Sequence, residues 1–484
     1  MTLKIELHTT GRNVPLRQMS GLFGLLMLAT SLYALGMTEA RAQSAMPANS
    51  QPLIEALTTA YMNNPTLLAR RARLRSADEG VPQALANWRP NVSVSLDAGY
   101  SDVFNSNSTG TARQQWRNST SYSLDVSQPL FRGGRTLAST SKSENTVRAE
   151  RALLMGVEQT VLLDTVSAYM DVFRDEAVLK LNINNEQVLS RQLEATRDRF
   201  DVGEITRTDV HQAEARRAKS KADRIQSEGD LEAARAAFLN VVGEAAPGGL
   251  GAPELPDGLP ESKKQVLELA ALKNPTVIAA EFTRLAALDN TDSVLGELLP
   301  ELKLTAGLSR AFETVAEQGR IDTAKVGVSL AVPIYQQGAV YSRLREARQS
   351  AAQQSFTVDE QRRKAVETAS KAWESLQTAA ARVTSFESQI DASIIALEGV
   401  QREASVGSRT VLDVLDAEQE LLTARVSLVR ARRDKIVAMY QVKSAVGQLT
   451  ARDLGLPVTL YDPRVHYQEV RRQWFGGRSS GDEK

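Results

Sequence analysis

The sequence predicts a mainly helical, duplicated protein in which each half contains two strands, a long helix and a second helix. Three observations support this prediction. Residues recur at a fixed spacing of 204, proline is absent from residues 130–246 and 334–456, and four segments alternate between apolar and small polar residues. Proline-free stretches permit long helices. Alternation with a period of two is typical of strands with one apolar face.

Composition limits the classes of protein that fit. The 484 residues include no Cys, which excludes disulfides, Cys-ligated metals and a lipid-modified N-terminal thiol. Lys and Arg number 58 and so do Asp and Glu, so the neutral charge gives no reason to expect nucleic acid. Aromatic residues make up only 5%, which favours long helices over a compact α/β domain.

Residues 1–42 have the pattern of an export signal. Arg12 and Arg17 precede an apolar stretch at 21–36, and Ala40-Arg41-Ala42 resembles a cleavage site. This stretch is shorter than the roughly 20 residues that cross a bilayer. We therefore expect cleavage and export, with an uncleaved N-terminal anchor as the alternative.

The rest of the chain reads as two structural repeats. The matching positions are Gly203 with Gly407, Asp209 with Asp413 and Gly243 with Gly447 at an offset of 204, and Asn64 with Asn274 at 210. The change of offset places an insertion in a loop, where length changes are tolerated. The expected division is a first repeat at 43–243, a Gly/Pro-rich linker at 244–264, a second repeat at 265–454 and a partly disordered tail at 455–484.

Long helices are expected at 135–201 and 204–242, and again at 338–405 and 408–448. The first would measure about 100 Å at 1.5 Å per residue. Gly203 and Gly407 would supply the positive φ that reverses the chain between the helices of each pair. The last helix shows a coiled-coil period, with apolar residues seven apart at Leu415, Leu422, Val429 and Ile436.

Strands are expected at 91–104, 118–130, 301–310 and 323–333. Their length and alternation fit strands that cross a bilayer at a tilt, apolar outward and polar inward. A soluble sheet with one buried face has the same alternation. Four strands cannot close a barrel, and open edges are not tolerated in lipid. A membrane-spanning sheet therefore requires two chains, giving eight strands, or three, giving twelve.

The chain resembles the TolC family of outer-membrane efflux proteins, and among them the type I secretion channels. The matching segments are the Asn-Pro pairs, Trp88-Arg89-Pro90, Gln128-Pro129-Leu130-Phe131-Arg132-Gly133-Gly134 and the run from Val406 to Ala417. The resemblance implies a homotrimer in the cell outer membrane, with a twelve-stranded transmembrane β-barrel continued by a periplasmic α-helical tunnel.

The resemblance also implies roles for four charged residues. Asp413 and Asp416, three apart on one helix face, match the acidic constriction of the channel, where a trimer would gather six carboxylates that attract cations. Asp209 and Arg409 match positions that hold the entrance closed. The family often has a tyrosine where Ala404 stands, so this chain departs from that closing network.

Helix capping is an alternative explanation for two of these residues. Thr206 with Asp209 and Thr410 with Asp413 have the spacing of capping boxes. Asp416 lies beyond the first turn, so capping explains it poorly. Capping and a constriction are compatible for Asp413.

The two reversal loops resemble the tips that dock a periplasmic adaptor, at Val202, Gly203, Val406 and Gly407. Alternatively, these glycines only end their helices. Catalytic signals are poor, because only His211 and His466 lie outside the expected signal and the sequence has no phosphate-binding glycine loop. We expect neither an enzyme nor a cofactor.

The expected function is a passive exit duct that spans the periplasm and works with an adaptor (membrane fusion protein) and an inner-membrane pump. Type I protein secretion with an ABC transporter is the first choice, and multidrug efflux with a proton-driven pump is the alternative. A periplasmic coiled-coil structural protein and, more remotely, a hydrolase are the other hypotheses.

Overall fold

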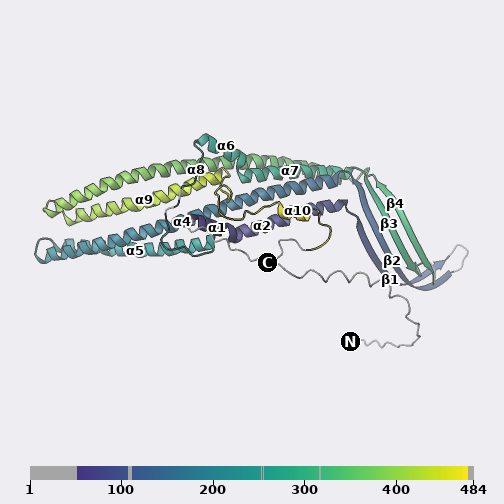
Figure 1. Ribbon diagram of the computed structural model, residues 1–484. Helices are drawn as coiled ribbons and strands as arrows, with labels where there is room; N and C mark the ends of the chain where they lie inside the picture. The colour runs from purple at the N-terminus through teal and green to yellow at the C-terminus, as the bar shows by residue number, and fades with distance from the viewer. Residues whose placement is uncertain (1–51, 107–111, 252, 254, 315–317, 478–484) are drawn as a thin grey trace, which may run out of the picture. The chain divides into compact units, whose positions relative to one another are not determined.

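The computed structural model describes residues 52–106, 112–251, 253, 255–314 and 318–477. The expected export signal at 1–42 lies outside these described residues, as does the end of the expected tail. Within the described part, helices pair along their length and four strands form one sheet (Figure 1). None of the described helices is long and apolar enough to cross a membrane.

Each half of the chain begins with short helices, continues through two strands and ends in two long helices. The first half comprises α1 (Pro52–Asn63), α2 (Pro65–Asp78), α3 (Gly80–Leu85), the 3-10 helix η1 (Ala86–Trp88), β1 (Asn91–Ser106), β2 (Ala112–Arg132), α4 (Arg135–Asp201) and α5 (Arg207–Val242). The second comprises α6 (Lys263–Lys273), α7 (Pro275–Leu295), η2 (Gly296–Leu298), β3 (Glu301–Phe312), β4 (Arg320–Ala331), α8 (Ala339–Ser405) and α9 (Val411–Ala445). A short helix, α10 (Val465–Arg471), follows.

The strands form an antiparallel sheet in the order β1-β2-β3-β4, so β1 and β4 are its edges (Figure 1). Apolar side chains share one face and are exposed, among them Val94 and Leu96 of β1 and Val328 of β4. On the other face, the hydroxyls of Ser95 and Ser123 lie 2.8 Å apart. This single chain therefore presents an apolar sheet face to its surroundings.

All four strands differ in extent from the expectation, β2 and β4 the most. β2 begins at Ala112 and ends at Arg132, because its backbone pairs with β1 and β3 beyond the alternating residues. Its register shifts between Pro129 and Phe131, where proline has no N–H to donate. β4 begins at Arg320 and ends at Ala331, before Pro333.

The long helices lie in pairs, α4 beside α5 and α8 beside α9, and α7 contacts both α4 and α8 (Figure 1). The predicted heptad seam is only partly buried: Leu415 is buried, whereas Leu422, Val429 and Ile436 are partly exposed. Small residues form the closely packed face instead. Ala438 packs against Ala369 and Ala372 of α8, because alanine lets two helix backbones approach.

The repeated Asn-Pro pairs connect the ends of helices. The side-chain oxygen of Asn64 accepts from the backbone N–H groups of Thr66 and Leu67, which caps α2, while its Nδ2 donates to Val241 O near the end of α5 at 2.9 Å. Asn274 caps α7 in the same way, and its Nδ2 donates to Ala445 O at the end of α9 at 3.1 Å. Each Asn therefore fixes a short helix to the end of a long one.

The described part of the tail, residues 455–477, packs against the first repeat and contains α10, a helix that the sequence did not predict. Val470 of α10 is buried, and His466 Nδ1 lies 3.1 Å from Asp78 Oδ2 of α2. Apolar residues on one face explain this packing, because a short helix becomes stable when it buries them.

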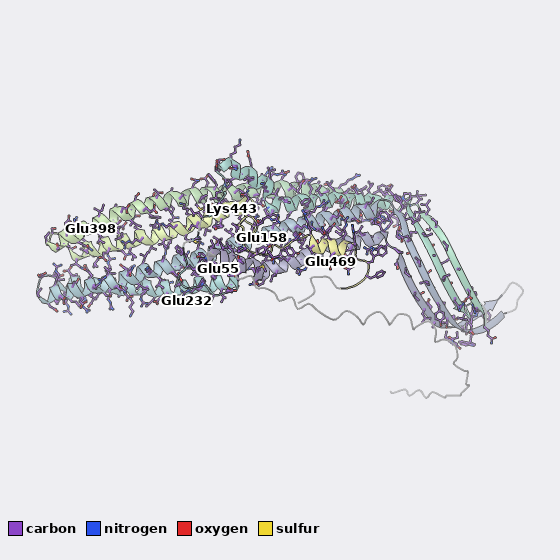
Figure 2. The ribbon with its side chains drawn as sticks, viewed as in Figure 1. Glu55, Glu158, Glu232, Glu398, Lys443 and Glu469 are labelled. Carbon is purple, nitrogen blue, oxygen red and sulfur yellow. The ribbon has the colours of Figure 1, made fainter. Side chains whose placement is uncertain are left out.

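Two charged side chains of the helices are withdrawn from solvent: Glu158 of α4 is half-buried, and Lys443 of α9 is buried (Figure 2). Glu158 of α4 accepts a hydrogen bond from the backbone N–H of Ala451 at 2.7 Å, and burial raises the pKa of its carboxyl. Burial lowers the pKa of Lys443 on α9, an effect that nearby Asp453 opposes. The hydrogen bond from Ala451 fixes the chain after α9 to the first repeat.

Two equivalent glycines should respond differently to alanine. Gly243 and Gly447 both have a positive φ, but a Cβ would meet nothing within 4 Å at Gly243 and would lie 2.4 Å from Lys273 O at Gly447. We expect Gly243→Ala to lower the free energy of unfolding by about 1–2 kcal/mol, because alanine is strained at this positive φ. Gly447→Ala should cost more, because the backbone of Lys273 must also move. Thermal unfolding in detergent measures both, and equal losses would contradict the close approach at Gly447.

Candidate channel constriction and helix tips

The two chain reversals form exposed tips. Val202 is 72% exposed in the turn between α4 and α5, and Val406 is 79% exposed in the turn between α8 and α9. Gly203 has a φ of +85° and Gly407 a φ of +82°, which confirms the predicted reversals. The four residues expected at the docking tips therefore lie at these turns, and their contact with an adaptor remains a prediction.

Both predicted capping boxes are present. Asp413 Oδ2 accepts from Thr410 N at 2.9 Å and from Thr410 Oγ1 at 2.8 Å, and Asp209 Oδ2 accepts from the same groups of Thr206 at 2.9 and 2.7 Å. The hydrogen bonds from Thr410, the backbone one foremost, hold the pKa of Asp413 below its usual range, and Arg409 contributes. Asp413 therefore stays ionised while capping α9.

The two residues expected to close the entrance each have a partner within their own tip. Arg409 pairs with Glu403 at 2.9 Å and lies 4.0 Å from Asp413, while Asp209 caps α5. Ala404, which stands where the family often has a tyrosine, accepts a hydrogen bond at its backbone oxygen from Gly407 N. A link between Asp209 and Arg409 of neighbouring copies remains a prediction.

Asp416 forms an ion pair with Arg216 of α5, a partner that the sequence analysis did not identify. The Asp416 side chain remains 57% exposed. One signal was available, because Arg216 follows Asp209 by one heptad and so lies on the same face of α5. The packing of α5 against α9 decides which residue of the other repeat faces Arg216, and the sequence pattern does not specify that packing.

Apolar contacts orient the start of α9. Val411 and Leu415 pack against Leu189 of α4 in a small buried cluster. At about 100° per residue, Asp413 projects from the opposite side of the helix to Val411 and Leu415, and Asp416 lies well away from them. The cluster therefore directs both carboxylates away from α4.

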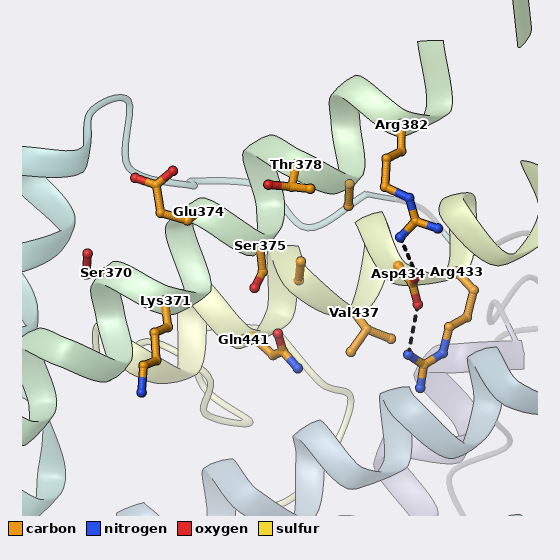
Figure 3. Close-up of a pocket in the computed structure, with 12 residues that line it drawn as sticks. Ser370, Lys371, Glu374, Ser375, Thr378, Arg382, Arg433, Asp434, Val437 and Gln441 are labelled. Atoms are coloured by element: carbon orange, nitrogen blue, oxygen red, sulfur yellow. Dashed lines mark hydrogen bonds and ion pairs between the residues drawn. The ribbon is translucent and has the colours of Figure 1, made fainter. Parts of the chain in front are cut away.

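A groove between α8 and α9 contains a chain of ion pairs (Figure 3). Asp434 of α9 lies between Arg382 of α8, at 3.5 Å, and Arg433 of α9, at 3.3 Å. Arg433 also pairs with Asp171 of α4 at 2.9 Å. These pairs are partly exposed, so each adds little stability. No cluster of three or more His, Asp or Glu side chains suited to a metal occurs in the described residues.

The sequence matches the family described as "Outer membrane efflux protein" over residues 56–244 and 266–448. The chain belongs to this family. It is similar to the outer membrane efflux protein BepC of Brucella suis, with 35% identity over 89% of this chain and 92% of BepC. It is 26% identical to outer membrane protein TolC of Escherichia coli, over 84% of each chain.

Two further likenesses bear on function and fold. The alkaline protease secretion protein AprF of Pseudomonas aeruginosa is 24% identical, over 91% of this chain and 90% of AprF. Among solved structures, the outer-membrane channel OprN matches with a TM-score of 0.71 and 22% identity, over 82% of this chain and 90% of OprN. The structure and these matches confirm the predicted fold and the predicted membership of the TolC-like outer-membrane efflux proteins.

The cap of α9 should protect its first turn in a pH-dependent manner. Thr410→Val removes the hydroxyl that bonds Asp413, so amide exchange in residues 411–415 should accelerate roughly fivefold, as for a typical lost cap. Because the pKa of Asp413 is depressed, its contribution is present above the unfolded-state pKa and is lost as pH falls through the folded-state pKa. The difference in amide-exchange rate between the Thr410→Val variant and the unaltered chain should therefore become smaller in strong acid.

Hydrogen-exchange mass spectrometry measures this effect. Thr423→Val is the matched control, because Thr423 is an exposed threonine in the interior of α9 whose hydroxyl bonds only local groups of the same helix. If both variants exchange alike in the first turn, the cap does not protect it.

Proposed function

We propose that three copies of the chain assemble into an exit duct in the outer membrane. The observation that carries this proposal is the open sheet, whose apolar side chains are exposed and whose edges are β1 and β4. Hydrocarbon does not tolerate unpaired backbone at such edges. In the assembly, β1 of each copy pairs with β4 of the next.

The need for a lumen favours three copies over two. Two copies would give eight strands, a barrel whose interior is filled by side chains. Three copies give twelve strands and leave space for a lumen. The helix pairs α4–α5 and α8–α9 then continue the barrel as a periplasmic tunnel about 100 Å long. The likeness to OprN, an outer-membrane channel, supports this arrangement.

The duct does not catalyse a reaction, and its cargo is delivered by partners. A periplasmic adaptor contacts the tips at Val202, Gly203, Val406 and Gly407, and an inner-membrane pump supplies the energy. Type I protein secretion with an ABC transporter is the preferred role, supported by the likeness to AprF, a protease secretion protein. Multidrug efflux with a proton-driven pump is the second candidate, supported by the likeness to BepC, an efflux protein.

The start of α9 forms the constriction of this duct. Asp413 and Asp416 of three copies surround the axis, and the contacts of Val411 and Leu415 with Leu189 turn them away from α4. Links between Asp209 and Arg409 of neighbouring copies hold the entrance closed. Opening breaks such charged hydrogen bonds when the adaptor and pump engage.

Crosslinking tests the number of copies and the pairing of edges. The chain has no Cys, so every disulfide arises from introduced residues. One cysteine in β1 and one in β4, scanned over residues 92–96 and 326–330, should give covalent species up to a trimer. A pair at Leu124 and Leu308, which face each other within one chain, is the control and should crosslink only internally.

Planar-bilayer recordings of the same purified protein should show open channels of uniform conductance. A structural rod would give no conductance, and a duct of two copies would stop at a covalent dimer.

Disruption of the gene separates the two candidate roles, because loss of a secreted protein indicates type I secretion and loss of drug resistance indicates efflux.

Cation block tests the constriction. Replacing Asp413 and Asp416 together by Asn removes six charges from a trimer, so divalent or trivalent cations should block the channel at least tenfold less well. Asn retains similar shape and hydrogen-bonding groups. Asp359→Asn is the matched control, because Asp359 is an exposed carboxylate of α8, far along the helix from the tip, and pairs locally with Arg362. Unchanged block in the double variant would contradict the ring of carboxylates.

A further inference from the structure

The end of the described chain is fixed beside the base of the sheet. Arg89 Nη1 donates to Gln473 O at 2.9 Å, and the Arg89 guanidinium lies 4.9 Å from the centre of the Trp474 ring. Arg89 precedes β1, which begins at Asn91, by two residues. The contact with Arg89 therefore holds residues 473–475 next to the first strand.

The preceding helix holds this segment from the other side. α10 contacts α2 and α3, and its Val470 is buried. Arg471 pairs with Glu144 of α4 at 2.9 Å, and His466 contacts Asp78 of α2. Contacts on both sides make residues 473–475 a positioned segment.

The two aromatic residues of this segment face outward. Trp474 is 58% exposed and Phe475 is 88% exposed, although α10 and Arg89 hold the backbone on both sides. A folded chain rarely positions adjacent large apolar residues in solvent without a partner for them. Arg89 and Arg472 add positive charge next to them.

The position of these residues indicates what covers them. Val92 is the first exposed apolar residue of β1, and the three residues from Arg89 to Val92 span at most about 10 Å. If the sheet crosses a bilayer, Arg89 and Trp474 lie where hydrocarbon gives way to headgroups. Trp is enriched at this boundary, and arginine there pairs with lipid phosphates.

We propose that Trp474 and Phe475, positioned by Arg89, form a second membrane contact outside the barrel. They bind the phospholipid of the periplasmic leaflet, with the aromatic rings at the headgroup boundary and with Arg89 and Arg472 directed to phosphates. This contact would fix the height of the tunnel relative to the membrane. It rests on the proposed membrane insertion of the sheet.

Spin labelling of the full-length protein in vesicles of phosphatidylethanolamine and phosphatidylglycerol tests this contact. A nitroxide on Phe475→Cys should collide with oxygen severalfold more, relative to a water-soluble nickel complex, than one on Val202→Cys. Val202 is the matched control because it is also an exposed apolar residue, at a helix tip, and the chain has no native Cys.

Each outcome distinguishes this inference from the proposed function. Channels with a bilayer-immersed label at residue 475 support both. If channels form but the label at residue 475 is as accessible to the nickel complex as the label at residue 202, only the membrane contact is overturned. The same holds if channels form and neither oxygen nor the nickel complex reaches the label, because a neighbouring copy would then cover the segment. Absence of channels in the unlabelled protein would overturn the proposed function itself.

Arg89→Gln provides a second measurement that does not alter the aromatic residues. Gln has no guanidinium to stack on Trp474. The rate at which the label at residue 475 collides with oxygen, measured relative to the label at residue 202, should therefore fall by at least half of its excess. Channel conductance should not change, because the strands remain intact. An unaltered label would show that Arg89 does not position the segment.

Discussion

The pairing of backbone groups at the edges of the sheet is the constraint on which the rest of the structure depends. β1 and β4 each have one side without a partner in the single chain, and the exposed apolar side chains of the sheet suit lipid rather than water. A bilayer offers no hydrogen bonds to such edges, so neighbouring copies must supply them. Because each pair of strands leads directly into a long helix, copies that join at their edges also bring their helices together. The barrel and the tunnel therefore follow from one requirement.

Lateral contact between helices explains why the two repeats match so closely in length. α4 and α8 both contain 67 residues, and α5 and α9 contain 36 and 35. A helix that packs along its whole length cannot gain or lose residues without shifting every later contact, whereas a loop can. Asn64 and Asn274 reinforce this match, because each bonds a short helix to the end of a long one at the equivalent place. The same fixed lengths keep the two tips at corresponding positions.

Patterns among neighbouring residues predicted where the long helices begin and end. They predicted less of how these helices pack against one another. The absence of proline and the glycines at 203 and 407 indicated helices and reversals that the structure contains, and Thr410 with Asp413 indicated a cap that is present. Such features depend on a few neighbouring residues. The buried face of α9 and the pairing of Asp416 with Arg216 depend on how helices distant in sequence lie together. α10 was missed because a seven-residue helix has too few turns to show a period.

The two carboxylates at the start of α9 differ in a way that matters for any constriction. Asp413 already accepts hydrogen bonds from Thr410, so its charge is shared with the first turn of the helix. Asp416 has Arg216 as a counter-ion within the same chain. A cation that enters a ring of these residues must therefore compete with an arginine at one position and with a cap at the other. Movement of α5 relative to α9 would separate Arg216 from Asp416 and leave that carboxylate free. In the proposed duct, opening of the entrance and attraction of cations would then be coupled through this ion pair.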